Sequence, residues 1–127
     1  MKLTNNFNLS EFACKDGTPV PSELLDNVTE LAKNLQVLRD FIGLPIKINS
    51  SYRTPSHNKA VGGAAKSQHL LAKAADIKVS GMKPADLAQI IEGLIDMGKM
   101  KQGGLGVYNT FCHYDIRGTK SRWDLRK

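Results

Sequence analysis

The chain has 127 residues, enough for one domain that buries its own core without disulfides or metal ions to hold it together. Hydrophobic residues make up 41% and charged residues 24%, which is typical of a soluble globular protein, and no window is long enough to span a membrane. The net charge of +6 fits an anionic polymer as partner, either nucleic acid or the bacterial wall, and fits equally a basic surface that only serves solubility.

Neither the cysteines nor the N-terminus indicates a secreted framework. Cys14 and Cys112 lie far apart with no Cys-x-x-Cys spacing, which argues against a disulfide framework or a zinc knuckle. In a strand, Cys112 points to the opposite face from His113, so we expect it to be a small core residue. Residues 1–6 lack the apolar region of a signal peptide, and we therefore expect synthesis in the cytosol without one.

The first predicted elements are a short turn and a long helix. Residues 7–12 predict a helical turn capped by Asn8 or Ser10. Between Ser22 and Ile42, apolar residues recur every three or four positions, which predicts one buried face of a long helix. Pro21 before this segment and Gly43 after it mark its ends. We assign this helix to the core and give it no chemistry.

The middle of the chain predicts two strands separated by a loop. Residues 46–51 alternate like a strand and lead to a turn, because Pro55 disfavours helix at the residue before it. Residues 56–66 are small and polar and predict a loop that contains His57 and the pair Gly62-Gly63. A β-prone run follows at residues 74–79.

The last third predicts a helix and a hairpin. Pro84 begins a second amphipathic helix, which Gly98 ends. Residues 103–108 and 111–116 form a hairpin through a two-residue link, and the tail from Arg117 is basic and carries the only tryptophan. This order of elements predicts an α+β fold, a small antiparallel sheet flanked by helices, in a single domain over residues 1–127.

Three residues indicate a metal site. Asp76 is out of place in the β-prone run 74–79 unless a partner such as a divalent cation compensates its burial. His69 precedes it in the loop, and His113 lies in another β-prone run. Two histidines and one aspartate leave the fourth tetrahedral position of zinc open for water, which is the arrangement of a catalytic site. Taken singly, a strand histidine is more often a hydrogen-bonded core residue than a ligand.

Three separated motifs resemble the M15 peptidases, from about Phe7 to Trp123. These motifs are Ser50–Pro55 with Asn58 and Gly62-Gly63, then Ser67-x-His69 with Asp76, then Phe111–Asp115 beside the Gly-x-Gly-x-Tyr hairpin. The family comprises zinc D-alanyl-D-alanine carboxypeptidases and related murein endopeptidases with the Hedgehog-type fold. The opening Asn8–Phe12 is similar to the entry segment of the subgroup found in phage and bacterial wall enzymes.

The resemblance implies a role for each matching residue. His69, Asp76 and His113 are the implied Zn²⁺ ligands. Arg53 is the implied catalytic cation, which holds a substrate carboxylate or carbonyl oxygen. Ser67 and Tyr108, with Arg53, are the implied substrate-binding residues.

The chain departs from the family pattern at two positions. Ala72 replaces a usual glycine, a mild change where the backbone keeps negative φ. Thr110 stands where several members carry a catalytic acid, three residues before the last histidine. Asp115 lies roughly 7 Å beyond His113 on the same strand face and is the best remaining carboxylate. It is a candidate for the general base or for a group that orients a ligand.

The expected function is zinc-dependent hydrolysis of peptidoglycan stem peptides, by a monomer that acts on the cell wall as a phage or mobile-element product. One alternative is a catalytically inactive zinc-binding structural or tail-associated module, which the missing acid at Thr110 supports. Another is a nucleic-acid-binding domain. We disfavour it because the basic residues are scattered and no reading motif is present.

Overall fold

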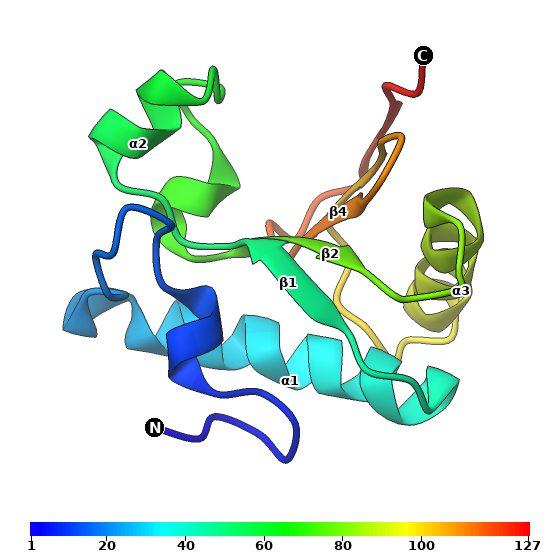
Figure 1. Ribbon diagram of the computed structural model, residues 1–127. Coiled ribbons are helices and arrows are strands. Elements are labelled where there is room, and N and C mark those ends of the chain that lie inside the picture. The colour runs from blue at the N-terminus through cyan, green and yellow to red at the C-terminus, as the bar shows by residue number, and fades with distance from the viewer.

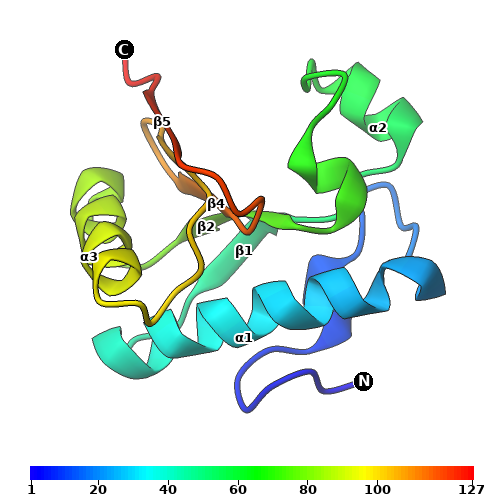
Figure 2. The same cartoon turned by 180° about the vertical axis from the view of Figure 1, so that it is seen from behind.

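The structure, a computed structural model, describes residues 1–127 and has the predicted α+β architecture (Figure 1). Helix α1 (Leu25–Ile42) runs along the sheet, and Figures 1 and 2 both show α2 (Pro55–Ala60) and α3 (Pro84–Asp96) at opposite sides of the molecule. No helix combines the length and the apolar character needed to cross a membrane.

The N-terminal turn is capped as the sequence predicts. A 3₁₀ turn covers Leu9–Phe12, where the Asn8 side chain accepts the Ser10 N–H and the Glu11 carboxylate accepts the Asn8 N–H at 2.7 Å. This reciprocal capping box satisfies two backbone donors that the turn leaves free. Phe7 and Phe12 are buried and fasten the segment to the body.

The long helix forms one side of the core. Its first turn, Ser22–Leu24, is 3₁₀, and α1 then continues to Ile42 and ends at Gly43 with φ 68°. The residues buried along α1 are Val28, Leu31, Ala32, Leu35 and Leu38, which confirms the predicted face. One cluster of 26 buried residues joins α1, α3 and the sheet, so the chain has a single core.

The predicted loop at residues 56–66 is wrong in its first part, where the structure has helix α2. Pro55 is the first helical residue, where its fixed φ favours the helix and its missing N–H costs nothing. Thr54 stays extended before the proline and caps the helix, since its hydroxyl accepts the His57 N–H at 3.2 Å. The glycines begin only after the helix ends.

The sheet has five strands in the order β1-β2-β4-β3-β5. Three pairings are antiparallel, and their strands are β1 (Lys47–Ser50), β2 (Ala74–Lys78), β4 (Cys112–Asp115) and β3 (Gly104–Val107). The tail adds β5 (Ser121–Asp124) parallel to β3, so the sheet is mixed and the purely antiparallel prediction is wrong at this edge. A short segment of mixed polarity gives too little pattern to predict a strand.

One row of residues crosses all five strands on the face opposite the core. The register places Ser50 beside Asp76, Asp76 beside His113, His113 beside Gly106, and Gly106 beside Trp123. Side chains in such a row share one face. A Cβ at Gly106 would lie 2.2 Å from Trp123 Nε1, so the glycine makes room for the indole beside His113.

Replacing either of two glycines with alanine is expected to change the free energy of unfolding, but in opposite directions. Gly93→Ala in α3 is expected to raise the free energy of unfolding by about 1 kcal/mol, because the new Cβ meets nothing within 4 Å and alanine favours helix. Gly106→Ala is expected to lower it by about 1–3 kcal/mol through overpacking against Trp123. Urea unfolding of both variants measures the pair, and equal effects would contradict the packing around Trp123.

Candidate metal centre

His69 enters the site from a short capped turn. The 3₁₀ turn Gln68–Leu71 begins at Ser67, whose hydroxyl accepts the His69 N–H at 3.2 Å. The turn ends at Ala72 with φ 56°, so the condition under which replacement of the usual glycine is mild is not met. A left-handed non-glycine residue costs about 1–2 kcal/mol, and the turn that aims His69 is therefore held by its surroundings.

The structure brings the three candidate ligands together. Asp76 Oδ1 lies 3.3 Å from His69 Nε2 and 3.1 Å from His113 Nδ1. The nearest ligand atoms of the three residues are all within 4.8 Å of one another, and all three side chains are buried. Tetrahedral zinc with bonds of about 2.1 Å needs ligand atoms about 3.4 Å apart, so this spacing fits the ion.

The outer hydrogen bonds of both imidazoles fix the ring nitrogens that face the centre. His69 Nδ1 lies 2.6 Å from the Ser51 carbonyl oxygen, which can only accept, so Nδ1–H donates and Nε2 is the nitrogen that faces Asp76. His113 Nε2–H donates to Asp115 Oδ2 at 2.7 Å, which leaves Nδ1 toward Asp76. Metal-binding histidines have this type of outer partner, so the donor set fits a divalent ion.

The pKa shifts of Asp76 and His113 also fit a site for a divalent cation. Burial raises the pKa of Asp76, but hydrogen bonds from His113 and His69 outweigh it and hold this pKa well below its usual range. Burial lowers the pKa of His113, yet hydrogen bonds to Asp115 and Asp76 bring it above its ordinary value. A proton on His113 Nδ1 would lie against Asp76 Oδ1, in the place that a metal cation can take instead.

Asp115 is enclosed behind His113 and has no exposed surface. Its Oδ1 accepts the Gly104 N–H at 2.8 Å and Arg117 Nε–H at 2.9 Å, while Oδ2 accepts from His113 and from Arg117 Nη2 at 2.8 Å. Burial raises the pKa of Asp115, but these donors outweigh it and keep this pKa low. Of the two roles considered for Asp115, orienting a ligand fits this geometry.

Asp115→Asn is therefore expected to weaken zinc binding by about 10–100-fold, because the amide no longer matches both His113 and Arg117 as an acceptor. Competition with a chromophoric chelator measures the change. Asp124→Asn is the matched control, since Asp124 pairs with Arg126 in the same two-residue spacing but is exposed. An unchanged affinity for Asp115→Asn would contradict the orienting role.

The centre opens into a cleft of about 620 Å³ whose lining is cationic. Arg53, Lys66 and Arg117 line it, and Asp76 is its only carboxylate. Arg53 Nη2 lies 3.4 Å from Asp76 Oδ2, and Nη1 donates to Asn58 Oδ1 at 3.3 Å. The guanidinium is thus held at the edge of the centre.

One wall of the cleft is aromatic. The rings of Tyr108 and Phe111 stack at 4.3 Å, Trp123 Nε1–H donates to the Tyr108 hydroxyl at 3.0 Å, and the Trp123 ring lies 5.0 Å from that of His113. The predicted substrate residues Ser67 and Tyr108 both line the cleft.

Sequence reasoning missed Trp123 and Arg117 as cleft residues, because the tail showed no strand pattern. For Arg117 a signal existed. It lies two residues after Asp115, the spacing that places two side chains on the same side of a strand.

Two other polar residues lie outside the cleft lining. Thr110 is exposed at the tip of the hairpin and lines a different hollow, with Pro45–Lys47 and Lys78–Met82. The position at which several members carry an acid therefore does not line the cleft of the centre. His57, considered as a loop residue, lies on α2 and does not line the cleft either.

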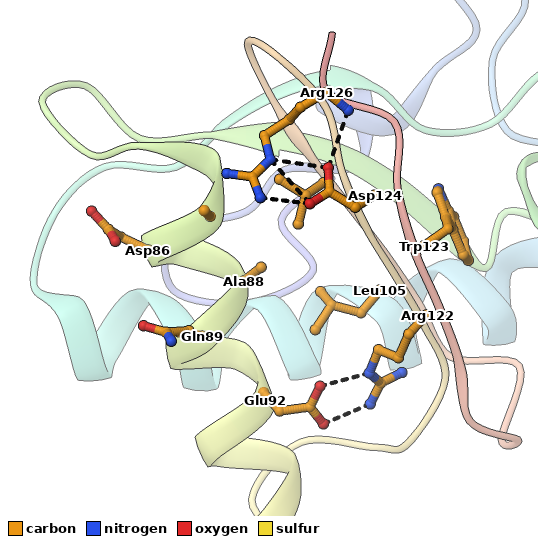
Figure 3. A pocket seen from close by; sticks show the side chains of 11 residues that line it. Asp86, Ala88, Gln89, Glu92, Leu105, Arg122, Trp123, Asp124 and Arg126 are labelled. Carbon is orange, nitrogen blue, oxygen red and sulfur yellow. Dashed lines mark hydrogen bonds and ion pairs between the residues drawn. The ribbon is translucent and has the colours of Figure 1, made fainter.

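A second hollow, of about 630 Å³, lies between α3 and strands β3 and β5 (Figure 3). Figure 3 shows Arg122 paired with Glu92 and Arg126 paired with Asp124, with Nε–Oε2 at 2.6 Å in the first pair. None of the three candidate ligands lines this hollow and its arginines are already neutralised, so we place no chemistry there.

The comparison with known families covers most of the chain. A family model described as Peptidase M15 matches residues 4–115, a stretch that contains Arg53, all three candidate ligands and Asp115. No curated protein matches the chain. Because the match spans the N-terminal turn, the metal centre and the strand that carries His113, the chain belongs to the M15 peptidase family.

Proposed function

We propose that the protein is a zinc-dependent peptidase that hydrolyses peptide bonds in the stem peptides of peptidoglycan. The observation that carries this proposal is the convergence of His69 Nε2, Asp76 Oδ1 and His113 Nδ1 at the base of an open cleft, beside the Arg53 guanidinium. Family membership supports zinc-dependent peptidase chemistry, and the lining of the cleft supports the substrate class.

Each protein group has a task in this chemistry. His69, Asp76 and His113 would hold the ion through three protein atoms. When bound, zinc supplies Lewis-acid chemistry, which lowers the pKa of a water and polarises a carbonyl group. Arg53 presents a planar, permanently charged fork that binds a substrate carboxylate or stabilises the charge developing on the carbonyl oxygen. Asp115 keeps the His113 ring in place through Nε2–H.

The cleft favours an anionic peptide. Lys66 adds an unpaired positive charge to that of Arg53, Arg117 is paired with the enclosed Asp115, and Asp76 is the only carboxylate in the lining. Tyr108 can donate its hydroxyl proton to a substrate, because the same oxygen already accepts from Trp123. Stem peptides carry several carboxylates along a short backbone, which matches this distribution. A protein that cuts them acts on the cell wall, and we propose a phage or mobile-element product.

A second candidate function is a zinc-binding module without hydrolysis, with a structural or tail-associated role. The observation that favours it is the absence of a free carboxylate from the cleft. Asp76 is committed to the centre, Asp115 is enclosed, and Thr110 lines a different hollow. A hydrolase in this family needs a group that accepts a proton from the attacking water.

One measurement, the release of amino groups from peptidoglycan, distinguishes the two candidate functions. The purified chain, stripped with a chelator and then reloaded with zinc, is incubated with purified peptidoglycan, and new amino groups are counted. Amino groups that appear only after reloading support the peptidase. Released D-alanine indicates carboxypeptidase action and opened cross-links indicate endopeptidase action. Zinc uptake without any new amino group would reject hydrolysis and support the module.

A further inference from the structure

A second group of metal-binding side chains lies outside the cleft. Cys14, Asp16 and His57 offer a sulfur, a carboxylate oxygen and an imidazole nitrogen that lie within 4.8 Å of one another. None of the three lines the cleft, and none takes part in the chemistry described above. They come from two segments, the turn after the N-terminal 3₁₀ element and the first turn of α2.

The N-terminal segment presents two of these side chains from one tight turn. The Cys14 N–H donates to the Thr18 carbonyl at 2.9 Å, and the Gly17 N–H donates to the Cys14 carbonyl at 3.0 Å, with Gly17 at φ 97°. Asp16 Oδ1 accepts the Thr18 N–H at 2.9 Å. Cys14 and Asp16 therefore project from a backbone that its own hydrogen bonds hold in shape.

Thr54 joins this turn to α2. Its hydroxyl donates to Asp16 Oδ2 at 2.9 Å, accepts the His57 N–H at 3.2 Å and lies 4.0 Å from Cys14 Sγ. All three candidate residues thus surround one hydroxyl. The His57 ring makes no hydrogen bond within the chain, so both of its nitrogens are available, and the imidazole is partly exposed.

The donor chemistry selects the ion. One thiolate, one imidazole and one carboxylate are all ligands that zinc accepts, whereas magnesium and calcium prefer oxygen alone. Cys14 is buried while Asp16 is exposed, so a metal bound between them is reached from solvent on the Asp16 side. Binding replaces the thiol proton of Cys14, which is released to solvent.

We propose that Cys14, Asp16 and His57 form a second, independent site for a zinc-like divalent ion, with one coordination position left to water. The ion bridges the N-terminal turn and α2. Helix α2 carries Asn58, whose Oδ1 accepts from Arg53 Nη1, so the bridge steadies the segment that contacts Arg53.

Cobalt distinguishes the two sites, because only the second contains sulfur. The metal-free full chain is titrated with Co²⁺ while absorption is recorded. The expected result is two equivalents per chain and a thiolate-to-cobalt charge-transfer band in the near ultraviolet. Cys14→Ser and His57→Ala are each expected to bind one equivalent without that band. Cys112→Ala removes the other free cysteine, which lies in the core, and is expected to retain both equivalents and the band.

His113→Ala separates this proposal from the proposed function. It is expected to lose one equivalent and to keep the charge-transfer band. One equivalent without a band in the parent, abolished by His113→Ala, would overturn the second site and leave the centre at His69 intact. One equivalent with a band that His113→Ala retains would support the second site and reject the centre. A parent that binds no Co²⁺ would overturn both.

The second site also predicts a stability effect. An ion that binds only the folded chain raises the unfolding temperature. In a His113→Ala background, added Zn²⁺ is expected to raise the unfolding temperature, and the further change Cys14→Ser is expected to abolish that rise. A rise that persists after Cys14→Ser would contradict the site.

Discussion

His113→Ala is expected to abolish peptidase activity and to remove zinc from the candidate centre. The imidazole supplies one of three protein ligand atoms, and its loss leaves Asp76 and Asp115 facing each other across an emptied position. The effect on zinc affinity should exceed the roughly 10–100-fold change expected when only an outer partner of a ligand is replaced. Amino-group release and zinc content, both measured per folded chain, test the prediction.

Thr110→Ala is the matched control for this experiment. Thr110 lies three residues before His113, at the exposed tip of the same hairpin, and faces a different hollow. Its replacement is expected to leave zinc content and turnover unchanged. A loss of turnover in Thr110→Ala, or full activity in His113→Ala, would contradict the arrangement of the centre. Circular dichroism of both variants separates a lost ligand from a lost fold.

Arg53→Lys is expected to reduce kcat/KM by about 10²–10³-fold, the cost of removing one preorganised donor to a developing negative charge. The lysine keeps the charge, but it cannot bond at once to Asp76 and Asn58 and still present a planar fork to the substrate. Steady-state kinetics on a synthetic stem peptide measure the change. If Arg53 mainly binds a ground-state carboxylate, KM rises while kcat is retained.

Lys66→Gln is the comparison for the arginine. Lys66 also lines the cleft, but it is exposed and makes no hydrogen bond or ion pair within the chain. Its loss should raise KM slightly and leave kcat unchanged, because an exposed charge is screened by solvent. Equal effects of Lys66→Gln and Arg53→Lys would show that the cleft uses only its net charge. Zinc content, measured in both variants, excludes an indirect effect through Asp76.

The two arginines of the cleft have different tasks. Arg117 binds both oxygens of Asp115 and lies 5.7 Å from the centre of the Trp123 ring, so its charge is paired at short range with that carboxylate. Arg53 contacts only one carboxylate oxygen, Asp76 Oδ2 at 3.4 Å, and its other two partners, Ser50 and Asn58, are neutral. This difference in charge pairing is the reason to assign substrate binding to Arg53 and support of the centre to Arg117.

Local patterns in the sequence predicted much of the framework. The apolar residues of α1 recur on one face, and Gly43 ends the helix in the left-handed conformation that glycine adopts most easily. The alternation around His113 placed Cys112 in the core, where it is fully buried. These features depend on residues within one or two turns or on one strand, so a short stretch of sequence contains the whole signal.

The same locality explains the errors. Residues 56–66 are small and polar and predict a loop, but Thr54 and Pro55, which lie just before them, start a helix together. Strand β5 is held by its pairing with β3, in which Ser121 lies beside Gly104, and it has no pattern of its own. A strand that is stabilised mainly by pairing with a neighbour cannot be predicted from its own few residues.

Some features of the candidate site were predicted from the sequence, and others are visible only in the tertiary structure. The sequence alone named His69, Asp76, His113 and Arg53 from residue type, spacing and family motif, and their roles as ligands and catalytic cation stay predictions. Only the tertiary structure decided which ring nitrogens face the centre, that Asp115 is enclosed behind His113, and that Trp123 from the tail completes the cleft. These results depend on strand register and on hydrogen bonds between distant segments. A one-residue slip would turn every side chain of a strand to the other face, and no single stretch of sequence contains that information.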